Sequence, residues 1–423
     1  MKFKVFSLGC KVNSYECAAL SSALLKEGYI EAGNSEPDIF IINTCSVTST
    51  ADQKSRQHIR KFMKLYPNAI SVVMGCYAQG NAELIANDIK PNILVGTSHR
   101  KDVPNLIKQY LDTKEPIVIV DENPRKYSYE EMGVTSFSEN TRAYLKIQDG
   151  CDNFCTYCIV PFRRGKMRSR SREAVLEEAK YLVSQGYQEI VLSGIHVGGY
   201  GRDLGNYTFS DLVRELLEIP NLSSLRISSI EESEIDDQLI DLLGKKDNLA
   251  KHLHIPLQSG SITVLKRMNR KYLPDDFYKK ITKIRESFPG VAFTTDVIVG
   301  FPGETEEEFK ETYEFIRKCG FNQLHVFPYS QREGTIAAKM PDQIDPRIKN
   351  ERVKILMDLS KSLWEEYTSR FIGQDVEVLV ERFENNLNIG HTTNYIEVAI
   401  PSYEGKVGSK ITVKLQKSSI ISK

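Results

Sequence analysis

The chain has 423 residues, 41% of them hydrophobic, and its 56 basic and 56 acidic side chains leave no formal net charge. This length predicts two or three domains, and the hydrophobic content excludes a wholly disordered chain. A nucleic-acid partner would have to bind at a local patch, because a neutral protein has no attractive overall field. No apolar run reaches the roughly 18 residues of a membrane span, and the first ten residues are too short for a secretion signal. We therefore expect a cytoplasmic protein.

Three cysteines in the first quarter of the chain share one local context. Short apolar runs at residues 4–9, 38–44 and 71–75 end directly before Cys10, Cys45 and Cys76. Helical patterns lie between them, at residues 15–27 and 51–65, which predicts a doubly wound α/β sheet. Such sheets bind ligands at the carboxyl ends of their strands, so these strand-end cysteines are predicted to converge on one site. The alternative is three small buried side chains, because free cysteine is often buried.

The middle of the chain repeats a strand–helix pattern. We predict an N-terminal α/β domain at residues 1–115, a linker at 116–136 and a partial (β/α) barrel at 137–370. The predicted barrel strands are six, at residues 144–148, 189–192, 224–229, 253–257, 292–299 and 323–329. In barrels of this type the chemistry takes place at the carboxyl ends of the strands.

A cysteine triplet, Cys151, Cys155 and Cys158, directly follows the first of these strands. Three thiolates at this CxxxCxxC spacing can hold three corners of a [4Fe–4S] cluster and leave the fourth iron open. Structural zinc usually takes four ligands, and no fourth cysteine or histidine lies close by in sequence. Three cysteines cannot pair among themselves as disulfides, and a reducing compartment is expected. For Cys17 and Cys319, on predicted helices, we expect core packing.

Other polar groups follow later strands, among them Gly194, Glu231 and Gln258. Glycine-rich turns let the backbone approach a ligand closely, although loose glycine patterns also arise by chance. The histidines near these strands are expected to be structural, and none is assigned a catalytic role.

Six basic residues form an arginine run within residues 163–172, beside the triplet and uninterrupted by any acid. Phosphate binding explains such a run, because each neutralised phosphate anchors a nucleic acid. We predict RNA contacts for Arg163, Arg164 and Lys166. The alternative is a loop whose arginines pair with carboxylates elsewhere in the fold.

The last segment, residues 371–423, alternates apolar and polar residues between glycine turns. Short strands of this kind predict a small OB-like β-barrel, a fold that often binds nucleic acids. Its tail carries Lys406, Lys410, Lys414, Lys417 and Lys423 without an acid after Glu404, which is also typical of a solvated face.

The order of these parts resembles the radical S-adenosylmethionine (SAM) methylthiotransferase family over nearly the whole chain. The resemblance rests on LGCKVNSYE, GCDNFCTYCIVPF, HLHIPLQSGS, TTDVIVGFPGET and HVFPYSQREGT, and GHTTNYIEV is similar to the pattern of a terminal TRAM domain. These motifs are most similar to the branch that acts on N6-threonylcarbamoyladenosine in tRNA. The isopentenyladenosine branch typically has Met where Val12 stands, and the ribosomal-protein branch differs around both cysteine sets.

The resemblance implies two [4Fe–4S] clusters, with the strand-end cysteines Cys10, Cys45 and Cys76 as ligands of an auxiliary cluster. It also implies two uses of SAM: one methylates a sulfur, and the other yields the radical that activates carbon 2 of the adenine. By analogy with related barrels, Tyr157 and Gly194 are expected near SAM, with Glu231 and Gln258 as further candidates. Implied partners are a tRNA with N6-threonylcarbamoyladenosine in its anticodon loop, an electron donor such as flavodoxin or ferredoxin, and a sulfur source.

Three alternatives stay open at this point. The enzyme could methylthiolate isopentenyladenosine in tRNA, or it could modify a ribosomal protein side chain. It could also be a non-catalytic RNA-binding iron–sulfur protein, which would bind RNA without cleaving SAM.

Overall fold

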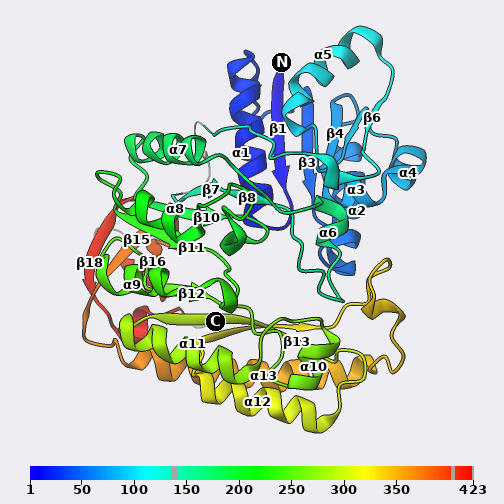
Figure 1. Cartoon of the computed structure of the whole chain (residues 1–423). Coiled ribbons are helices and arrows are strands. Elements are labelled where there is room, and N and C mark those ends of the chain that lie inside the picture. The colour runs from blue at the N-terminus through cyan, green and yellow to red at the C-terminus, as the bar shows by residue number, and fades with distance from the viewer. Residues whose placement is uncertain (135–140, 402–404, 422–423) are drawn as a thin grey trace.

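The computed structural model describes residues 1–134, 141–401 and 405–421 (Figure 1). The end of the predicted linker, residues 135–136, and the first residues of the predicted barrel range, 137–140, lie outside this description, as do Glu404 and Lys423. The main sheets fall within residues 2–119, 143–328 and 375–414. In Figure 1 the N-terminal sheet stands at the top right, the green strands of the middle region lie beneath it, and the terminal sheet lies at the left.

The N-terminal sheet is parallel throughout, with the order β2-β1-β3-β4-β5-β6. Its strands are β1 (Lys2–Ser7), β2 (Ile30–Glu31), β3 (Ile39–Thr44), β4 (Ile70–Gly75), β5 (Ile93–Val95) and β6 (Ile117–Ile119). Its helices are α1 (Lys11–Lys26), α2 (Ser49–Leu65), α3 (Cys76–Gly80), α4 (Ala82–Leu84) and α5 (Val103–Thr113), with short turns η1 (Ile85–Ile89), η2 (Arg100–Asp102) and η3 (Pro124–Lys126).

Side chains alternate across the buried strands of this sheet, because successive residues of a strand point to opposite faces. Ile39 and Ile41 pack with α1 and α5 on one face. Phe40 and Ile42 pack with α2 and α3 on the other. Helices therefore cover both faces, and the predicted doubly wound α/β domain is confirmed.

The middle region has six parallel strands in chain order. They are β7 (Ala143–Lys146), β10 (Glu189–Ser193), β11 (Ser224–Ile227), β12 (His252–His254), β13 (Ala292–Val299) and β14 (Gln323–Pro328). Two isolated parallel bridges, Leu225–Leu249 and Ser229–His254, join the two halves between β11 and β12. This arrangement confirms the predicted partial (β/α) barrel.

The helices of this region surround the barrel strands. They are α6 (Val160–Arg164), α7 (Arg172–Ser184), α8 (Phe209–Leu217), α9 (Asp237–Lys245), α10 (Ile262–Arg267), α11 (Pro274–Ser287) and α12 (Glu306–Cys319). Short turns η4 (Val197–Gly199), η5 (Glu232–Glu234) and η6 (Ala337–Lys339) and an antiparallel pair, β8 (Gln148–Asp149) with β9 (Arg168–Ser169), complete it. Tyr15 and Ala19 of α1 belong to the barrel core, so the N-terminal region packs directly on the barrel.

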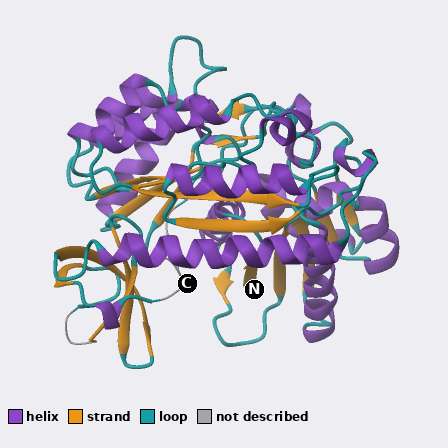
Figure 2. Cartoon of the chain, turned by 90° about the horizontal axis from the view of Figure 1, so that it is seen from below, coloured by secondary structure: helices purple, strands orange, loops and turns teal. Residues whose placement is uncertain are grey.

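The long helix α13 (Pro346–Ser369) packs on β14 and leads into an antiparallel sheet with the order β17-β16-β15-β18. Its strands are β15 (Asp375–Glu384), β16 (Leu387–Thr392), β17 (Glu397–Pro401) and β18 (Lys410–Lys414), followed by the turn η8 (Lys417–Ser419). A bridge from Val398 to Ile420 returns the chain to β17, so the sheet curls on itself as a small β-barrel does. Figure 2 shows these strands at one edge of the molecule, apart from the barrel strands.

Candidate active site

The strand-end cysteines lie along one edge of the N-terminal sheet. Cys10 caps α1 shortly after β1, Cys45 directly follows β3, and Cys76 is the first residue of α3 after β4. Because β1, β3 and β4 are neighbours in the sheet, their carboxyl ends bring the three cysteines together. Cys10 is exposed, whereas Cys45 and Cys76 are buried. The prediction that these cysteines converge is confirmed.

Two glycines make this close approach possible. A Cβ atom on Gly9 would lie 2.7 Å from the Cys45 Sγ, and one on Gly75 would lie 2.6 Å from the Thr44 carbonyl oxygen. Both glycines have positive φ, at +104° and +101°, which other residues rarely adopt. The turns after β1 and β4 therefore require glycine, and a larger residue would push the cysteines apart.

Arg164 connects the barrel to this cysteine site. Its Nε donates to the Cys76 Sγ at 3.3 Å, and one terminal nitrogen donates to the Asn13 Oδ1 at 2.8 Å. The same Asn13 oxygen accepts a hydrogen bond from the Cys10 thiol at 3.7 Å. Burial raises the pKa of Cys76 to about 11, and the Arg164 guanidinium opposes this shift because a nearby cation favours the thiolate, the form that ligates metals.

The RNA contact predicted for Arg164 is wrong. Its side chain is 1% exposed, and it contacts Glu16 and Asp149 within the protein. Three other members of the arginine run also pair with carboxylates: Arg168 with Asp149, Arg170 with Glu131 and Glu178, and Arg172 with Glu215. For these four residues the alternative, a loop that pairs with carboxylates of the fold, is correct.

RNA contacts by Arg163 and Lys166 stay predictions. Arg163 is half-buried and Lys166 is exposed. The Arg163 guanidinium lies so close to Gly80 that a Cβ on that glycine would come within 2.0 Å of its central carbon.

A buried ion network surrounds Arg164, between α1 and the start of the barrel. It comprises Glu16, Arg100, Lys146, Asp149 and Arg164, none of them more than 3% exposed at the side chain. Lys146 lies 2.8 Å from a Glu16 oxygen and 2.7 Å from an Asp149 oxygen. Burial alone would raise the pKa of Glu16 and Asp149, but the surrounding cations hold both well below their usual range. The two carboxylates therefore stay charged and join the N-terminal region to the barrel.

The cysteine triplet lies on the loop after β8, where later parts of the barrel hold it. The Thr156 backbone N–H donates to the Met268 carbonyl at 3.0 Å, and the Thr156 hydroxyl donates to the Arg267 carbonyl at 2.8 Å. Within the loop, the Cys158 N–H donates to the Cys155 carbonyl at 2.9 Å. Burial raises the pKa of Cys158 to about 12, so metal binding there would have to release a proton.

Two cationic side chains contact the triplet. The sequence analysis did not predict these contacts. Arg270 donates to the Cys155 Sγ at 3.6 Å and also pairs with Glu231. His196 pairs with Glu234 at 2.6 Å. Burial lowers the pKa of His196, but hydrogen bonds with Cys151 and Glu234 outweigh it and raise the pKa to about 10. Neither ion pair can be predicted from the sequence, because the two residues of each pair lie at least 38 positions apart in the chain.

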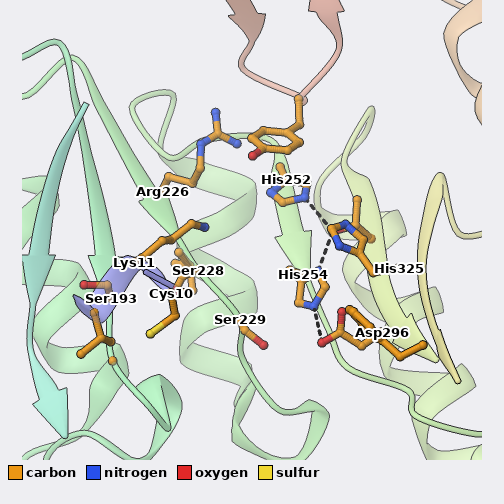
Figure 3. Close-up of a pocket in the computed structure, with 17 residues that line it drawn as sticks. Cys10, Lys11, Ser193, Arg226, Ser228, Ser229, His252, His254, Asp296 and His325 are labelled. Atoms are coloured by element: carbon orange, nitrogen blue, oxygen red, sulfur yellow. Dashed lines mark hydrogen bonds and ion pairs between the residues drawn. The ribbon is translucent and has the colours of Figure 1, made fainter. Parts of the chain in front are cut away.

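Two cavities border the cysteine sites. The larger, of about 570 Å³, extends from Cys10 across the barrel strands (Figure 3). Gly194 is one of its lining residues. The smaller, of about 230 Å³, is lined by Cys155, Glu231 and Arg270, among others. The volume of the larger cavity is in the range of small-molecule and cofactor sites, roughly 300–1,000 Å³.

The structure places the four predicted SAM neighbours in different surroundings. Gly194 and Glu231 line one cavity each. Tyr157 is half-buried against the cluster around Phe301 and Tyr329. Gln258 is buried with φ +61° and lines neither cavity. SAM contacts by all four stay predictions.

The remaining cysteines and histidines fit their expected roles. Cys17 and Cys319 are buried in the hydrophobic cores. His252 and His254 both contact the Thr294 hydroxyl at 2.9 Å. Within the part of the chain that the structure describes, no helix is long and apolar enough to cross a membrane.

The comparisons with known proteins match this architecture. A family model of the radical SAM superfamily matches residues 145–316, and one described as an uncharacterized protein family, UPF0004, matches residues 2–96. The chain is 46% identical to the threonylcarbamoyladenosine tRNA methylthiotransferase MtaB of Bacillus subtilis, covering 97% of this chain and 93% of that protein. The chain belongs to the tRNA methylthiotransferase family of radical SAM enzymes.

Other relatives of this methylthiotransferase fall in two branches. The chain is 36% identical to MtaB of Aquifex aeolicus, and the match covers 98% of this chain and all of that protein. It is 35% identical to a tRNA-2-methylthio-N(6)-dimethylallyladenosine synthase of Acetivibrio thermocellus, covering 97% and 87%. Among solved structures, the radical SAM methyltransferase TsrM of Kitasatospora setae shares the fold with a TM-score of 0.59 at 12% identity, covering 98% of this chain and 88% of that one.

Enzymes of this family are transferases that use SAM and two [4Fe–4S] clusters, and the residues of this methylthiotransferase fit those groups. Each cysteine set offers three thiols, and each has a cationic side chain at one sulfur, Arg164 at Cys76 and Arg270 at Cys155. Among the described residues no three His, Cys, Asp or Glu side chains are placed to hold a single metal ion. Cysteine thiolates are the usual ligands of iron–sulfur clusters, so the donor atoms of both sets suit a cluster.

Proposed function

We propose that this chain adds a methylthio group to carbon 2 of N6-threonylcarbamoyladenosine beside the anticodon of tRNA. The observation that carries the proposal is the 46% identity to an MtaB enzyme over nearly the whole of both chains. The geometry supports it, because a cavity of about 570 Å³ lies beside Cys10 and a second cavity of about 230 Å³ lies beside Cys155. Nucleoside mass spectrometry of tRNA from cells with and without the gene tests it, and the 2-methylthio derivative should disappear with the gene.

We propose Cys151, Cys155 and Cys158 as ligands of the radical cluster and the strand-end cysteines as ligands of the auxiliary cluster. With SAM, these groups supply a 5′-deoxyadenosyl radical and a transferable methylthio sulfur. The ion network links the two cysteine sets, because Arg164 contacts Cys76 and also Asp149, which shortly precedes Cys151 in the chain. Arg164 and Arg270 place positive charge beside the ligand sulfurs, which stabilises thiolates.

The proposed surroundings of SAM are Tyr157, Gly194, Glu231 and Gln258. Gly194 has no side chain, so its backbone can approach a ligand closely. The Gln148 side chain holds this loop in place, because its oxygen accepts hydrogen bonds from the N–H groups of Ile195 and His196. The proposal includes an electron donor such as flavodoxin or ferredoxin and a separate sulfur source, and it places the enzyme in the cytoplasm with its tRNA.

Metal content tests the ligand assignment. Anaerobically reconstituted protein should contain about eight irons per chain, in two [4Fe–4S] clusters. Replacing either cysteine set by alanine should leave about four. Iron and sulfide analysis with electron paramagnetic resonance measures both, and replacement of Cys17 and Cys319 is the matched control that should keep all eight. Full iron in the strand-end triple variant would contradict the auxiliary site.

Binding of tRNA by the terminal sheet is a separate prediction. Lys406, before β18, Lys414, at its end, and Lys417, in η8, are exposed, whereas Lys410 pairs with Glu377 at 2.7 Å. Replacing the three exposed lysines by glutamine should weaken binding of all tRNAs and lower the slope of log affinity against log salt by roughly 0.7 to 0.9 for each phosphate that is no longer neutralised. Fluorescence anisotropy at several salt concentrations measures this. Lys245→Gln, at an exposed lysine on α9, is the control, and an equal slope in both variants would leave the terminal lysines as a solvated face.

Methylthiolation of dimethylallyladenosine is the second candidate. The relatives of that branch, at 35% and 36% identity, favour it. The nucleoside analysis distinguishes the two, because each branch yields a product of different mass.

A further inference from the structure

The larger cavity has a cationic wall built from three parts of the chain. Lys11 comes from the start of α1, Arg226 from β11, and Tyr395 from the turn between β16 and β17. Figure 3 shows the Lys11 and Arg226 side chains on the same side of the cavity, above Cys10. The N-terminal region, the barrel and the terminal sheet therefore all contribute to one binding surface.

Positive charge exceeds negative charge at this wall. Arg226 makes two hydrogen bonds to Glu189, at 2.8 and 2.9 Å. Arg142 pairs with the same Glu189 and with Glu381. Lys11 forms no ion pair with any residue that the structure describes. The two arginines are thus matched by two carboxylates while Lys11 has none among the described residues, so the wall can accept one more negative group.

Arg226 also has an unused donor. It is 2% exposed, and its second terminal nitrogen, Nη1, is buried without a hydrogen-bond partner among the described residues. A buried, unpaired donor costs free energy unless a ligand satisfies it. Arg226 lines the cavity, so a ligand acceptor that reaches this nitrogen would satisfy it.

Tyr395 fixes the position of this guanidinium. The Arg226 guanidinium lies 5.1 Å from the centre of the Tyr395 ring, and the ring stacks on His252 at 4.4 Å. Tyr395 has φ +69°, in the left-handed region, so the turn that presents it is unusual for a tyrosine. The terminal sheet thus completes the cationic wall.

The opposite end of the cavity has a different character. His254 lies 3.3 Å from Asp296, and the His325 ring meets the His254 ring edge-on at 5.4 Å (Figure 3). The Asp296 carboxylate would repel an acidic group. A ligand with one acidic end and one neutral end therefore has a single favourable orientation, with its acid toward Lys11 and Arg226.

We propose that Lys11 and Arg226 form a carboxylate subsite that recognises the amino-acid part of the modified adenine, with Tyr395 as the positioning residue for Arg226. This inference rests on the proposed function. The threonylcarbamoyl group ends in a carboxylate, whereas a dimethylallyl group is a hydrocarbon that would leave the charges of this wall unpaired. Since Lys11 directly follows Cys10, a carboxylate held there keeps the base beside the strand-end cysteines.

The test compares three anticodon stem-loops with the reconstituted holoenzyme. They carry N6-threonylcarbamoyladenosine, the same nucleoside with its carboxylate converted to the primary amide, or plain adenosine. The wild type should bind the acid roughly 10- to 100-fold more tightly than the amide, because hydrogen bonds to charged groups are the strong ones. Lys11→Met should reduce this ratio toward one and leave the affinity for plain adenosine unchanged, and Lys11→Arg should keep most of it. Tyr395→Leu should lower the ratio in part.

The controls separate this subsite from other effects. Lys108→Met, at an exposed lysine that pairs with Glu27 at the end of α1, should leave the acid-to-amide ratio unchanged. Cleavage of SAM without RNA by Lys108→Met should equal that of the wild type, because Lys108 does not line the cavity.

Each outcome decides one question. If the wild type binds acid and amide equally, or if Lys11→Met keeps the full ratio, the carboxylate subsite is wrong while the proposed function stands, provided that the wild type still methylthiolates the acid. If the wild type leaves the acid unmodified and methylthiolates a dimethylallyladenosine loop, the proposed function itself is wrong.

Discussion

Replacing Cys10, Cys45 and Cys76 together by alanine should abolish methylthiolated product while cleavage of SAM to 5′-deoxyadenosine continues under a strong reductant. The physical reason is the separation of the two cysteine sets. The strand-end cysteines lie at the edge of the N-terminal sheet, and the cysteine triplet lies on the loop after β8, held there by backbone and hydroxyl contacts to residues 267 and 268. The first set can therefore be removed without dismantling the loop that carries the second.

Liquid chromatography with mass spectrometry measures both products in one reaction. The converse variant, with alanine at Cys151, Cys155 and Cys158, should lose both activities. Cys17→Ala with Cys319→Ala is the matched control, because those cysteines are core residues, and it should retain both. Product formation by the strand-end triple variant would rule out these cysteines as the site of sulfur delivery.

The backbone architecture could be predicted from the sequence because the residue patterns that indicate strands and helices are local. Buried parallel strands are short apolar runs, and a residue just after such a run lies at the sheet edge whatever the rest of the chain does. That reasoning placed Cys10, Cys45 and Cys76 together without any knowledge of their mutual distances. It also gave six barrel strands, which the structure has in the same chain order.

Ion pairs between side chains could not be predicted from the sequence, because the paired residues lie far apart in the chain. Arg164 contacts Glu16, which lies 148 residues earlier, so an uninterrupted basic run looked free to bind phosphate. The cationic wall could not be predicted from the sequence for the same reason, because Lys11, Arg226 and Tyr395 come from three separate parts of the fold. No local pattern distinguishes an arginine that will meet a carboxylate from one that will stay exposed.

The ion network around Arg164 should be essential for stability. Arg164→Met removes one cation from two carboxylates that are at most 2% exposed, and breaking a buried pair in this way costs about 3–5 kcal/mol. Arg172→Met is the matched control in the same run: Arg172 is 44% exposed and pairs with Glu215, and such surface pairs contribute about 0–1 kcal/mol. Urea unfolding of both variants, with and without iron, measures the difference.

The same network should make the protein sensitive to acid. The pKa of Glu16 and of Asp149 lies well below its usual range in the folded state. Their charges therefore stabilise the fold above the unfolded pKa of about 4, and this contribution is lost as the pH falls through the folded values. Arg164→Met leaves Arg100 and Lys146 in place, so it should reduce the loss of stability on acidification without removing it. Equal urea midpoints for Arg164→Met and Arg172→Met from neutral pH down to about pH 2 would show that the network does not hold the N-terminal region to the barrel.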